Sequence, residues 1–143
     1  MKFDRMNSAG YFANLLSRQL SAELHKRLAP LGLAPGQFGP LVVLWERDGI
    51  TQKEILKKFS VEQATLANTL TRMERDGLIV RKDHPADSRA RTIHLTDKAH
   101  QIKDAAFAAA KETNDLAMTC LSDQEQKQFL DLLQRVTDTL DQG

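Results

Sequence analysis

The sequence has 143 residues, of which 41% are hydrophobic and 27% are charged. This length is typical of one domain, and the composition is ordinary for a globular protein with a buried core. The 20 basic and 19 acidic residues give a formal net charge of +1, which argues against a histone-like protein or one with a polybasic arm.

Further global features favour a cytoplasmic protein that does not contact a membrane. The longest apolar runs, such as residues 41–45 and 105–110, are far too short to span a bilayer. No apolar stretch follows Lys2 and Arg5, so we expect no signal peptide. The single cysteine, Cys120, excludes a disulfide within the chain and fits a reducing compartment.

The charges are unevenly distributed along the chain. Residues 51–91 contain 9 basic and 6 acidic side chains, a net charge of +3, whereas residues 92–143 contain 5 basic and 9 acidic side chains, a net charge of −4. A basic segment is compatible with nucleic-acid binding, although a difference of this size also arises by chance in compact proteins.

The first two predicted helices have apolar stripes and clear end signals. Between residues 8 and 28, apolar side chains recur at three- and four-residue steps, and Pro30 and Gly32 end the helix. A second helix is predicted to begin near Pro35, because proline lacks the N–H that would be unpaired at a first helical position. Gly49 is predicted to end it.

Two short helices follow, each with a predicted capping box. Thr51 with Glu54 marks the start of a helix over residues 52–58, and Ser60 with Gln63 marks the start of a helix over residues 61–76. Two short helices joined by a tight turn are typical of a helix-turn-helix motif.

The periodicity then changes from helical to extended. Residues 78–82 form a short stretch that contains the β-branched Ile79 and Val80, and residues 91–95 alternate between polar and apolar side chains, with a polar, turn-rich stretch between them. This pattern predicts a β-hairpin with an extended tip. The element order predicts a mainly α protein with a small β-wing, which is a winged helix-turn-helix.

The second helix of the turn motif has one apolar and one polar face. Leu66, Leu70 and Met73 lie at i, i+4 and i+7 and are expected to pack on the core. The opposite face carries hydrogen-bonding side chains: Gln63, Thr65, Asn68, Thr69, Arg72 and Arg75. Such side chains read base edges and phosphates, and the alternative is a solvated helix face. The preceding capped helix, the following hairpin and the scarcity of acidic groups favour the DNA-binding interpretation.

The tip of the predicted hairpin carries Asp87 and Arg89, with Arg91 two residues later. An arginine on a protruding tip is able to enter a DNA minor groove, where the negative potential is deep over A·T tracts. Asp87 is close enough in sequence to hold Arg89 through a charge-assisted hydrogen bond. The alternative is a surface turn with a weak ion pair.

The chain resembles the MarR (multiple-antibiotic-resistance regulator) family of transcription factors. The segments that carry the resemblance are TQKEI over residues 51–55, SVEQATLANTLTRMERDGLI over residues 60–79, and DSRARTIHLT over residues 87–96. The aspartate–arginine wing that leads into Leu95, Thr96 and a long helix is the most specific part. Many members carry arginine where this chain has Asn68, so the resemblance does not assign a base to that contact.

The resemblance implies a homodimeric winged-helix repressor or activator that binds double-stranded DNA at a pseudo-palindromic operator. It implies that the polar face of residues 63–72 enters the major groove and that Arg89 enters the minor groove, with Asp87 as its orienting partner. Contacts with the DNA backbone are predicted at Thr51, Gln52 and Ser60. A small aromatic or phenolic effector is implied between the winged core and the dimer helices. The residues predicted to line its pocket, each of which also fits plain core, are Phe12, Leu16, Phe38 and Trp45.

The flanking helices predict a dimer independently of the resemblance. Thr96 caps a helix that is predicted to reach about Leu121, and Ser122 with Glu125 forms a third capping box that opens a last helix. A winged core cannot cover all the apolar side chains outside it, and exposed patches of this kind mark partner interfaces. The predicted interface residues are Leu15, Leu24, Leu116, Phe129, Leu133 and Val136. An intramolecular helical cap on a monomer is the alternative.

We therefore predict one compact chain with three parts. These are an N-terminal dimerisation helix over residues 1–34, a DNA-binding core over residues 35–97, and C-terminal dimerisation helices over residues 98–143.

The sequence carries no motif that indicates an enzyme, a cofactor or a metal site. It has no phosphate-binding loop, dinucleotide-binding turn or nucleophile elbow, and its histidines lack a tight metal-ligand spacing. Cys120 is expected to be a small buried hydrophobic residue. Two functional classes remain, a DNA-binding regulator and a winged-helix protein-interaction module without DNA binding. Arg72, Arg89 and Arg91 favour the regulator, because an interaction module has no need of cations on both helix and tip.

Overall fold

The computed structural model describes residues 1–141 and consists of helices with one small antiparallel sheet. The last two residues of the predicted C-terminal segment, 142 and 143, lie outside the described residues. The elements in chain order are η1 (Arg5–Asn7), α1 (Ala9–Leu28), η2 (Ala29–Leu31), α2 (Phe38–Glu46), β1 (Ile50–Thr51), α3 (Gln52–Lys58), α4 (Gln63–Arg75), β2 (Ile79–Asp83), β3 (Arg91–Leu95), α5 (Asp97–Ala117) and α6 (Asp123–Asp141).

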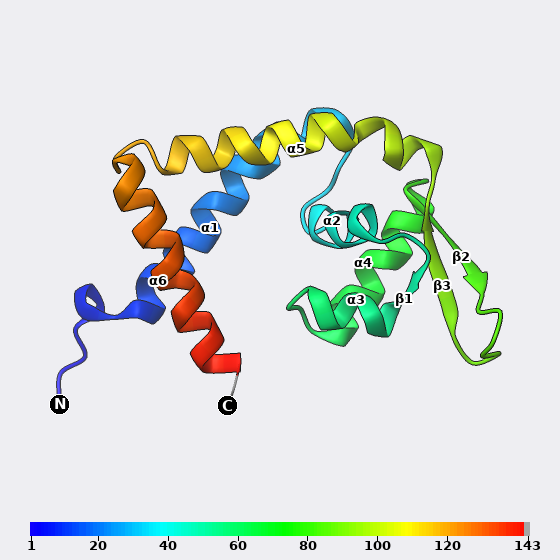
Figure 1. The fold of residues 1–143 in the computed structure, drawn as a ribbon, viewed down its shortest axis with the longest axis horizontal. Helices are drawn as coiled ribbons and strands as arrows, with labels where there is room; N and C mark the ends of the chain where they lie inside the picture. Colours follow the sequence, from blue (N-terminus) through cyan, green and yellow to red (C-terminus); the bar gives the residue numbers. More distant parts are fainter. Residues whose placement is uncertain (142–143) are drawn as a thin grey trace.

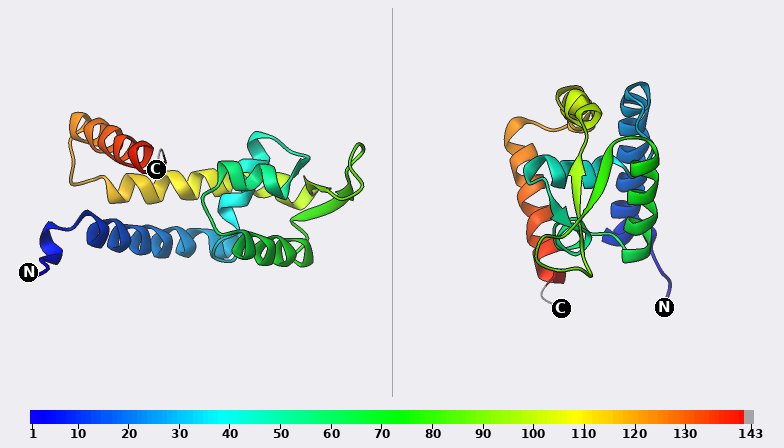
Figure 2. Two further views of the ribbon diagram at one scale, coloured as in Figure 1. Left: turned by 90° about the horizontal axis from the view of Figure 1, so that it is seen from below. Right: turned by 90° about the vertical axis from the view of Figure 1, so that its right-hand side faces the viewer.

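The molecule is elongated, and α5 runs along its length (Figure 1). One end holds α2, α3, α4 and the sheet, and the other holds the first turns of α1 together with α6. Helices α1 and α5 lie side by side along the long axis (Figure 2). This arrangement confirms the predicted fold class, in which a winged helix-turn-helix is flanked by helices from both ends of the chain.

The sheet has the strand order β1-β3-β2, with β3 antiparallel to both neighbours. Ile93 lies opposite Ile50 on one side and Arg81 on the other. The hairpin of β2 and β3 was predicted, but the two-residue strand β1 was not, because two residues are too few to show a period of two.

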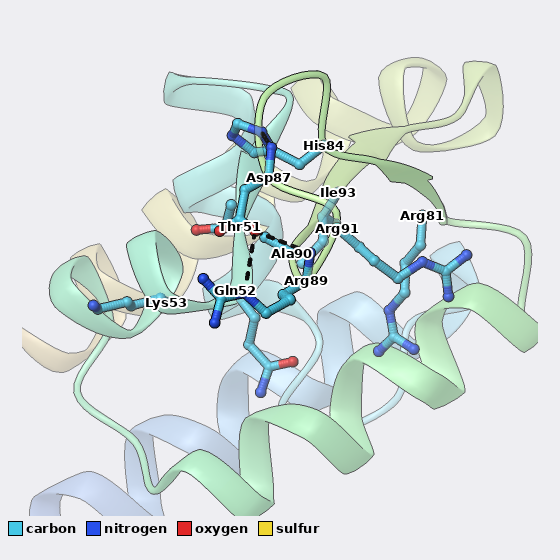
Figure 3. Close-up of a pocket in the computed structure, with 10 residues that line it drawn as sticks. All are labelled: Thr51, Gln52, Lys53, Arg81, His84, Asp87, Arg89, Ala90, Arg91 and Ile93. Carbon is cyan, nitrogen blue, oxygen red and sulfur yellow. Dashed lines mark hydrogen bonds and ion pairs between the residues drawn. The ribbon is translucent and has the colours of Figure 1, made fainter.

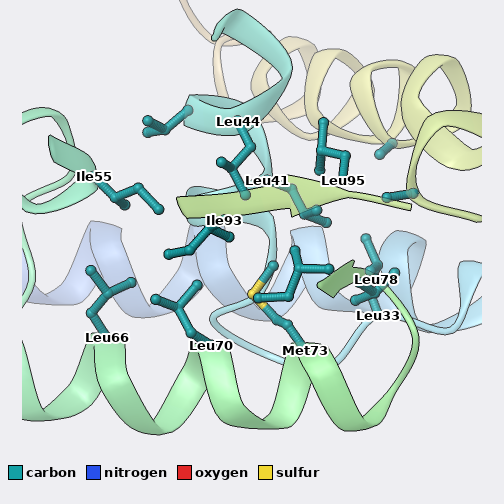
Figure 4. Close-up of a cluster of buried hydrophobic side chains, with 14 of the residues drawn as sticks. Leu33, Leu41, Leu44, Ile55, Leu66, Leu70, Met73, Leu78, Ile93 and Leu95 are labelled. Carbon is teal, nitrogen blue, oxygen red and sulfur yellow. The ribbon is translucent and has the colours of Figure 1, made fainter. Parts of the chain in front are cut away.

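The core lies between α2, α3, α4 and the sheet (Figure 4). Leu66, Leu70 and Met73 from α4 are at most 1% exposed, as their helical spacing predicted. Burial of each such side chain contributes about 1.5–3 kcal/mol relative to an exposed position. This packing holds one face of α4 inward and leaves the other face at the surface.

Two helix starts differ from the sequence prediction. Helix α2 begins at Phe38 instead of Pro35, because residues 34–37 form a turn in which Gln37 N–H donates to the Ala34 carbonyl (3.2 Å) and Gly36 has a positive φ of 86°. Helix α4 begins at Gln63, after a non-helical stretch whose residue Val61 packs against the core.

The predicted capping box at Ser60 is therefore wrong. Glu62 occupies the N-cap position of α4 and makes no side-chain capping bond. The capping boxes at α3 and α6 are confirmed. Thr51 Oγ1 accepts from Glu54 N–H (3.2 Å), and Ser122 Oγ accepts from Glu125 N–H (3.2 Å).

Helix α5 ends at Ala117, several residues before the predicted end near Leu121. A turn follows, and Gln126 Nε2 donates to the carbonyls of Met118 (3.1 Å) and Leu121 (3.2 Å), which supports the sharp reversal into α6. Because Cys120 lies in this turn instead of on the helix stripe, it is exposed, and the prediction that it is buried is wrong.

Candidate nucleic-acid interface

The outer face of α4 presents the polar side chains that the sequence predicted. Gln63, Thr65, Asn68 and Arg72 are all exposed, opposite the buried leucines. Among residues 1–141, the side chains of these four residues form no hydrogen bond or ion pair with another residue. They are therefore available to an external ligand.

Thr69 lies on the same helix but differs from its neighbours. Its side chain is half-buried, and its hydroxyl donates to the Thr65 carbonyl at 2.9 Å. Such back-bonding is common for threonine in helices. Thr69 therefore offers chiefly its methyl group to a ligand, whereas Thr65 offers a free hydroxyl.

Helix α3 lies beside α4 and places two of the predicted backbone-contact residues at its start. Thr51 is half-buried, and its hydroxyl is engaged with Glu54 in the capping box. Gln52 is half-buried and lines the hollow between α3 and the wing, whereas Ser60, in the segment before α4, is exposed.

The tip of the wing brings Asp87 and Arg89 together as predicted. Asp87 Oδ1 accepts from Arg89 N–H at 2.9 Å and lies 3.8 Å from Arg89 Nε. The Arg89 side chain is 94% exposed, so the guanidinium remains accessible to a partner. The carboxylate of Asp87 thus fixes the backbone of Arg89 and biases the direction of its side chain.

A hollow of about 400 Å³ separates the wing from the start of α3 (Figure 3). Arginine and lysine side chains from both elements surround it, namely Lys53, Arg81, Arg89 and Arg91, and Asp87 is the carboxylate among the lining residues. Lys53 and Arg81 were not among the predicted site residues. A basic hollow of this composition suits a phosphate group.

Helix α6 is unusual because none of its described residues is buried. It makes little contact with the rest of the chain, as its position in Figure 1 illustrates. Its apolar side chains are left exposed: Leu130, Leu132, Leu133, Val136 and Leu140. A groove of about 540 Å³ lies between α1, α5 and α6, and Leu16, Phe129 and Leu133 are among its lining residues.

The predicted interface residues do not all share this surface. Leu116, Leu133 and Val136 are exposed, and Leu15 and Phe129 are half-buried. Leu24 packs against the core of its own chain and therefore belongs to the junction between α1 and the winged core.

Comparisons with known proteins agree with this architecture. Residues 33–90 match the family model described as MarR family. The organic hydroperoxide resistance transcriptional regulator of Bacillus subtilis (strain 168) is 30% identical over 144 residues, which cover 99% of this chain and 97% of that protein. This chain belongs to the MarR family of transcriptional regulators.

Solved structures of similar fold extend along nearly the whole chain. The PcaV transcriptional regulator from Streptomyces coelicolor, in complex with its natural ligand, superposes with a TM-score of 0.86 at 22% identity and covers 96% of this chain and 97% of that one. A putative MarR-family regulator from Listeria monocytogenes, complexed with a 26mer DNA, gives a TM-score of 0.82 at 22% identity and covers 98% of this chain and 90% of that one.

In this MarR-family chain the four predicted effector-pocket residues do not come together. Phe38 and Trp45 pack edge to face at 6.3 Å, and Phe107 of α5, which was not predicted, joins both rings. Phe12 lies near the start of α1 and packs on Tyr11, and Leu16 lines the groove beside α6. The sequence shows a single apolar stripe along α1. Such a stripe does not reveal that the first half of the helix and the second half pack against different parts of the chain.

A separate hollow of about 270 Å³ lies between α1 and the segment before α2. Leu24, His25, Phe38 and Phe59 contribute to its lining, and His25 Nδ1 is buried without a hydrogen-bond partner. Sequence analysis did not single out His25 or Phe59 for this role, because neither belongs to a motif.

Two further findings concern residues 1–141 of this MarR-family chain. No helix among them is long and apolar enough to cross a bilayer. No cluster of three or more histidine, cysteine, aspartate or glutamate side chains is placed to hold a metal ion in the same part of the chain.

Proposed function

We propose that this MarR-family regulator is a repressor that binds a pseudo-palindromic operator as a homodimer and is released by a small aromatic or phenolic effector. The observation that carries the proposal is the outer face of α4, whose hydrogen-bonding side chains are exposed and unengaged beside a wing with an accessible arginine. We further propose that it acts on DNA in the bacterial cytoplasm and catalyses no reaction.

Helix α4 enters the major groove in this proposal. Arg72 pairs with guanine or a phosphate, and Asn68 and Gln63 pair with adenine, because each side chain matches the hydrogen-bonding pattern of that base. Thr65 supplies a hydroxyl and Thr69 a methyl group. The hollow between Lys53 and Arg91 lies beside this face and supplies positive charge for the phosphate backbone.

The wing supplies the second contact. Arg89 projects from the tip and enters the adjacent minor groove, where its charge is attracted to the deep negative potential of A·T-rich sequence. The Listeria monocytogenes structure with DNA supports this assignment, because its fold is shared along 98% of this chain.

Dimerisation supports recognition of two half-sites. The exposed apolar side chains of α6 and the groove beside it fit the helices of a second copy. Two-fold symmetry then places the two α4 helices about 34 Å apart, one turn of B-DNA, which explains the expected pseudo-palindrome.

The hollow between α1 and the segment before α2 is the proposed effector site. Its lining is mostly apolar, and the buried, unpartnered His25 Nδ1 is able to hydrogen-bond a hydroxyl or carboxylate on an aromatic ring. The PcaV structure, which contains that protein's natural ligand, supports effector binding by this fold.

The test is a binding experiment with DNA selected from a random pool by the purified protein. Fluorescence anisotropy should show binding that weakens by roughly a hundredfold or more between 50 and 200 mM salt, because phosphate contacts release counterions. Arg72→Ala should weaken binding by about 1–3 kcal/mol and relax the preference at one base pair. Lys111→Ala on α5 is the control, since it also removes one positive charge but lies outside α4 and the wing and pairs with Asp115 on its own helix.

The protein-interaction module is the competing function. It predicts that no enriched sequence emerges from the selection and that any weak binding is the same for wild type and Arg72→Ala. That result would reject the proposed function.

A further inference from the structure

One imidazole organises the turn at the tip of the wing. His84 is half-buried, and its Nδ1 accepts two backbone hydrogen bonds, from Ala86 N–H at 3.0 Å and from Asp87 N–H at 3.1 Å. An imidazole nitrogen accepts only when it carries no proton, so the neutral ring must hold its proton on Nε2.

The same turn is closed by the backbone on its other side. His84 N–H donates to the Ala90 carbonyl at 3.2 Å, and Ala90 N–H donates to the Asp87 carbonyl at 3.1 Å. Asp87 is therefore held at three points: its N–H by His84, its carbonyl by Ala90 and its carboxylate by Arg89. The imidazole holds the backbone N–H of Asp87, and the N–H of Arg89 holds the Asp87 carboxylate.

We propose that His84 is a positioning residue for DNA binding, which acts through Asp87 to fix Arg89 in front of the minor groove. The chain of contacts runs from His84 Nδ1 to the Asp87 N–H, and from Asp87 Oδ1 to the Arg89 N–H at 2.9 Å (Figure 3). This inference rests on the proposed function, in which the wing contacts DNA.

The physical reason is the entropy of an exposed tip. Asp87 and Arg89 are both exposed, so no packing restrains them. Without the two bonds to His84, residues 85–89 gain backbone freedom, and ordering them on DNA then costs binding free energy. The imidazole thus pre-organises the tip before DNA is bound.

His84 has one alternative role that must be separated. It lines the same hollow as Lys53, Arg81 and Arg91, so a direct contact between its ring and a DNA phosphate is the alternative role. Two substitutions distinguish the roles, because asparagine keeps an acceptor at the position of Nδ1, whereas glutamine reaches the position of Nε2.

The first experiment measures the affinity of His84→Asn, His84→Gln and His84→Leu for the duplex selected by the wild-type protein. We expect His84→Asn to bind within about twofold of wild type, and His84→Leu and His84→Gln to bind about tenfold more weakly, as the loss of two backbone hydrogen bonds would give. The melting temperature should be nearly unchanged, because the turn is exposed. In an Arg89→Ala background, His84→Leu should add less than about twofold, since the two residues act through one contact.

The second experiment tests the same inference without DNA. Heteronuclear NOE values of residues 86–89 in the free protein should fall in His84→Leu and remain near wild type in His84→Asn. A wing tip that stays rigid in His84→Leu overturns the proposal whatever the protein binds.

The remaining outcomes are equally decisive. If His84→Gln retains affinity and His84→Asn loses it, the ring contacts DNA directly and the positioning role is wrong. The positioning role is also rejected if His84→Leu weakens DNA binding by the same factor in the Arg89→Ala background as in the wild type. If the wild type does not bind DNA but the NOE values fall in His84→Leu and stay near wild type in His84→Asn, the proposed function is rejected. The role of His84 in ordering the tip is then retained.

Discussion

Arg81 and Arg89 line the same hollow, yet their surroundings give them different roles. The Arg81 side chain is 19% exposed, its N–H donates to Glu74 Oε2 at 3.2 Å, and its guanidinium lies 3.9 Å from Glu74 Oε1. Arg81 therefore ties the hairpin to α4. Arg89 is 94% exposed and remains available for a ligand. Residue type alone does not separate these two roles, because burial and neighbouring carboxylates decide them.

Arg89→Ala should reduce affinity mainly for operators with A·T-rich flanks. The expected loss is roughly tenfold on such flanks and clearly smaller on G·C-rich flanks, because the narrow minor groove of A-tracts attracts the arginine most strongly. Anisotropy titrations on matched duplexes that differ only in the flanks provide the measurement. Arg89→Lys is the control that keeps the charge, and equal losses on both flanks would count against minor-groove insertion.

At the scale of the elements, the capping boxes show how far local sequence determines a helix start. The pattern at Thr51 and Glu54 produces a capping box, but the pattern at Ser60 and Gln63 does not. Both have suitable side chains at the right spacing. The second fails because packing of Val61 on the core leaves residues 60–62 outside the helix. Tertiary contacts therefore override a local signal of about 1 kcal/mol.

Thr51→Ala and Ser60→Ala form a matched pair that tests this difference. Thr51→Ala should destabilise the protein by about 0.5–2 kcal/mol and lower the melting temperature by a few degrees, because the start of α3 loses its cap. Ser60→Ala should leave the melting temperature nearly unchanged. Circular-dichroism melting measures both variants, and similar losses in the two would contradict the structure.

Asp76 joins the end of α4 to the segment before α2. Its Oδ2 accepts from Gln37 Nε2 at 3.0 Å, its Oδ1 accepts from Arg75 Nε at 3.3 Å, and Lys98 Nζ donates to its carbonyl at 2.7 Å. The hydrogen bond from the buried Gln37 side chain, followed by the contacts with Arg75, holds the pKa of Asp76 below its ordinary value.

This lowered pKa predicts acid sensitivity. Because the folded pKa lies below the unfolded one, the ionised carboxylate stabilises the fold above the unfolded pKa, and this contribution is lost as the pH falls through the folded pKa. Below about pH 4 the melting temperature of wild type should therefore fall more than that of Asp76→Asn. Melting curves at a series of acidic pH values measure this, and parallel declines would show that Asp76 does not contribute.

At the scale of the whole molecule, the chain has a well-buried core, to which Leu28 of α1 and Ala106 and Ala109 of α5 contribute, and a helical end in which α6 is not covered. The winged core buries most of its leucines and isoleucines almost fully. Helix α6, by contrast, leaves Val136 56% exposed and Leu140 75% exposed. Apolar surface of this kind favours association, so the helical end is where a second copy is expected.

Val136→Glu should convert the proposed dimer into a monomer and weaken operator binding. Two-fold symmetry places the charge in the interface twice, and we expect the dimer dissociation constant to rise by roughly thirtyfold or more. Analytical ultracentrifugation measures the change. Gln134→Glu, which adds the same charge to α6 away from the apolar stripe, is the control and should remain dimeric. An unchanged sedimentation profile for Val136→Glu would place the interface elsewhere.

The amino-acid sequence was sufficient to predict the element order, the buried face of α4 and the pairing of Asp87 with Arg89. These features depend on local spacing, such as the i, i+4 and i+7 positions of Leu66, Leu70 and Met73, and local spacing is visible in one chain. The net charge of +3 over residues 51–91 agrees with the basic hollow beside the wing, although the hollow itself was not predicted.

The sequence did not reveal which side chains meet across long sequence separations, and the folded chain shows these contacts. The fold separated Phe12 and Leu16 from Phe38 and Trp45, and it brought His25 and Phe59 to one hollow. It also exposed Cys120 and moved the starts of α2 and α4. These outcomes depend on packing between segments that are distant in the chain. The periodicity of apolar residues predicts which face of a helix is buried, but it does not predict which distant segment packs against that face.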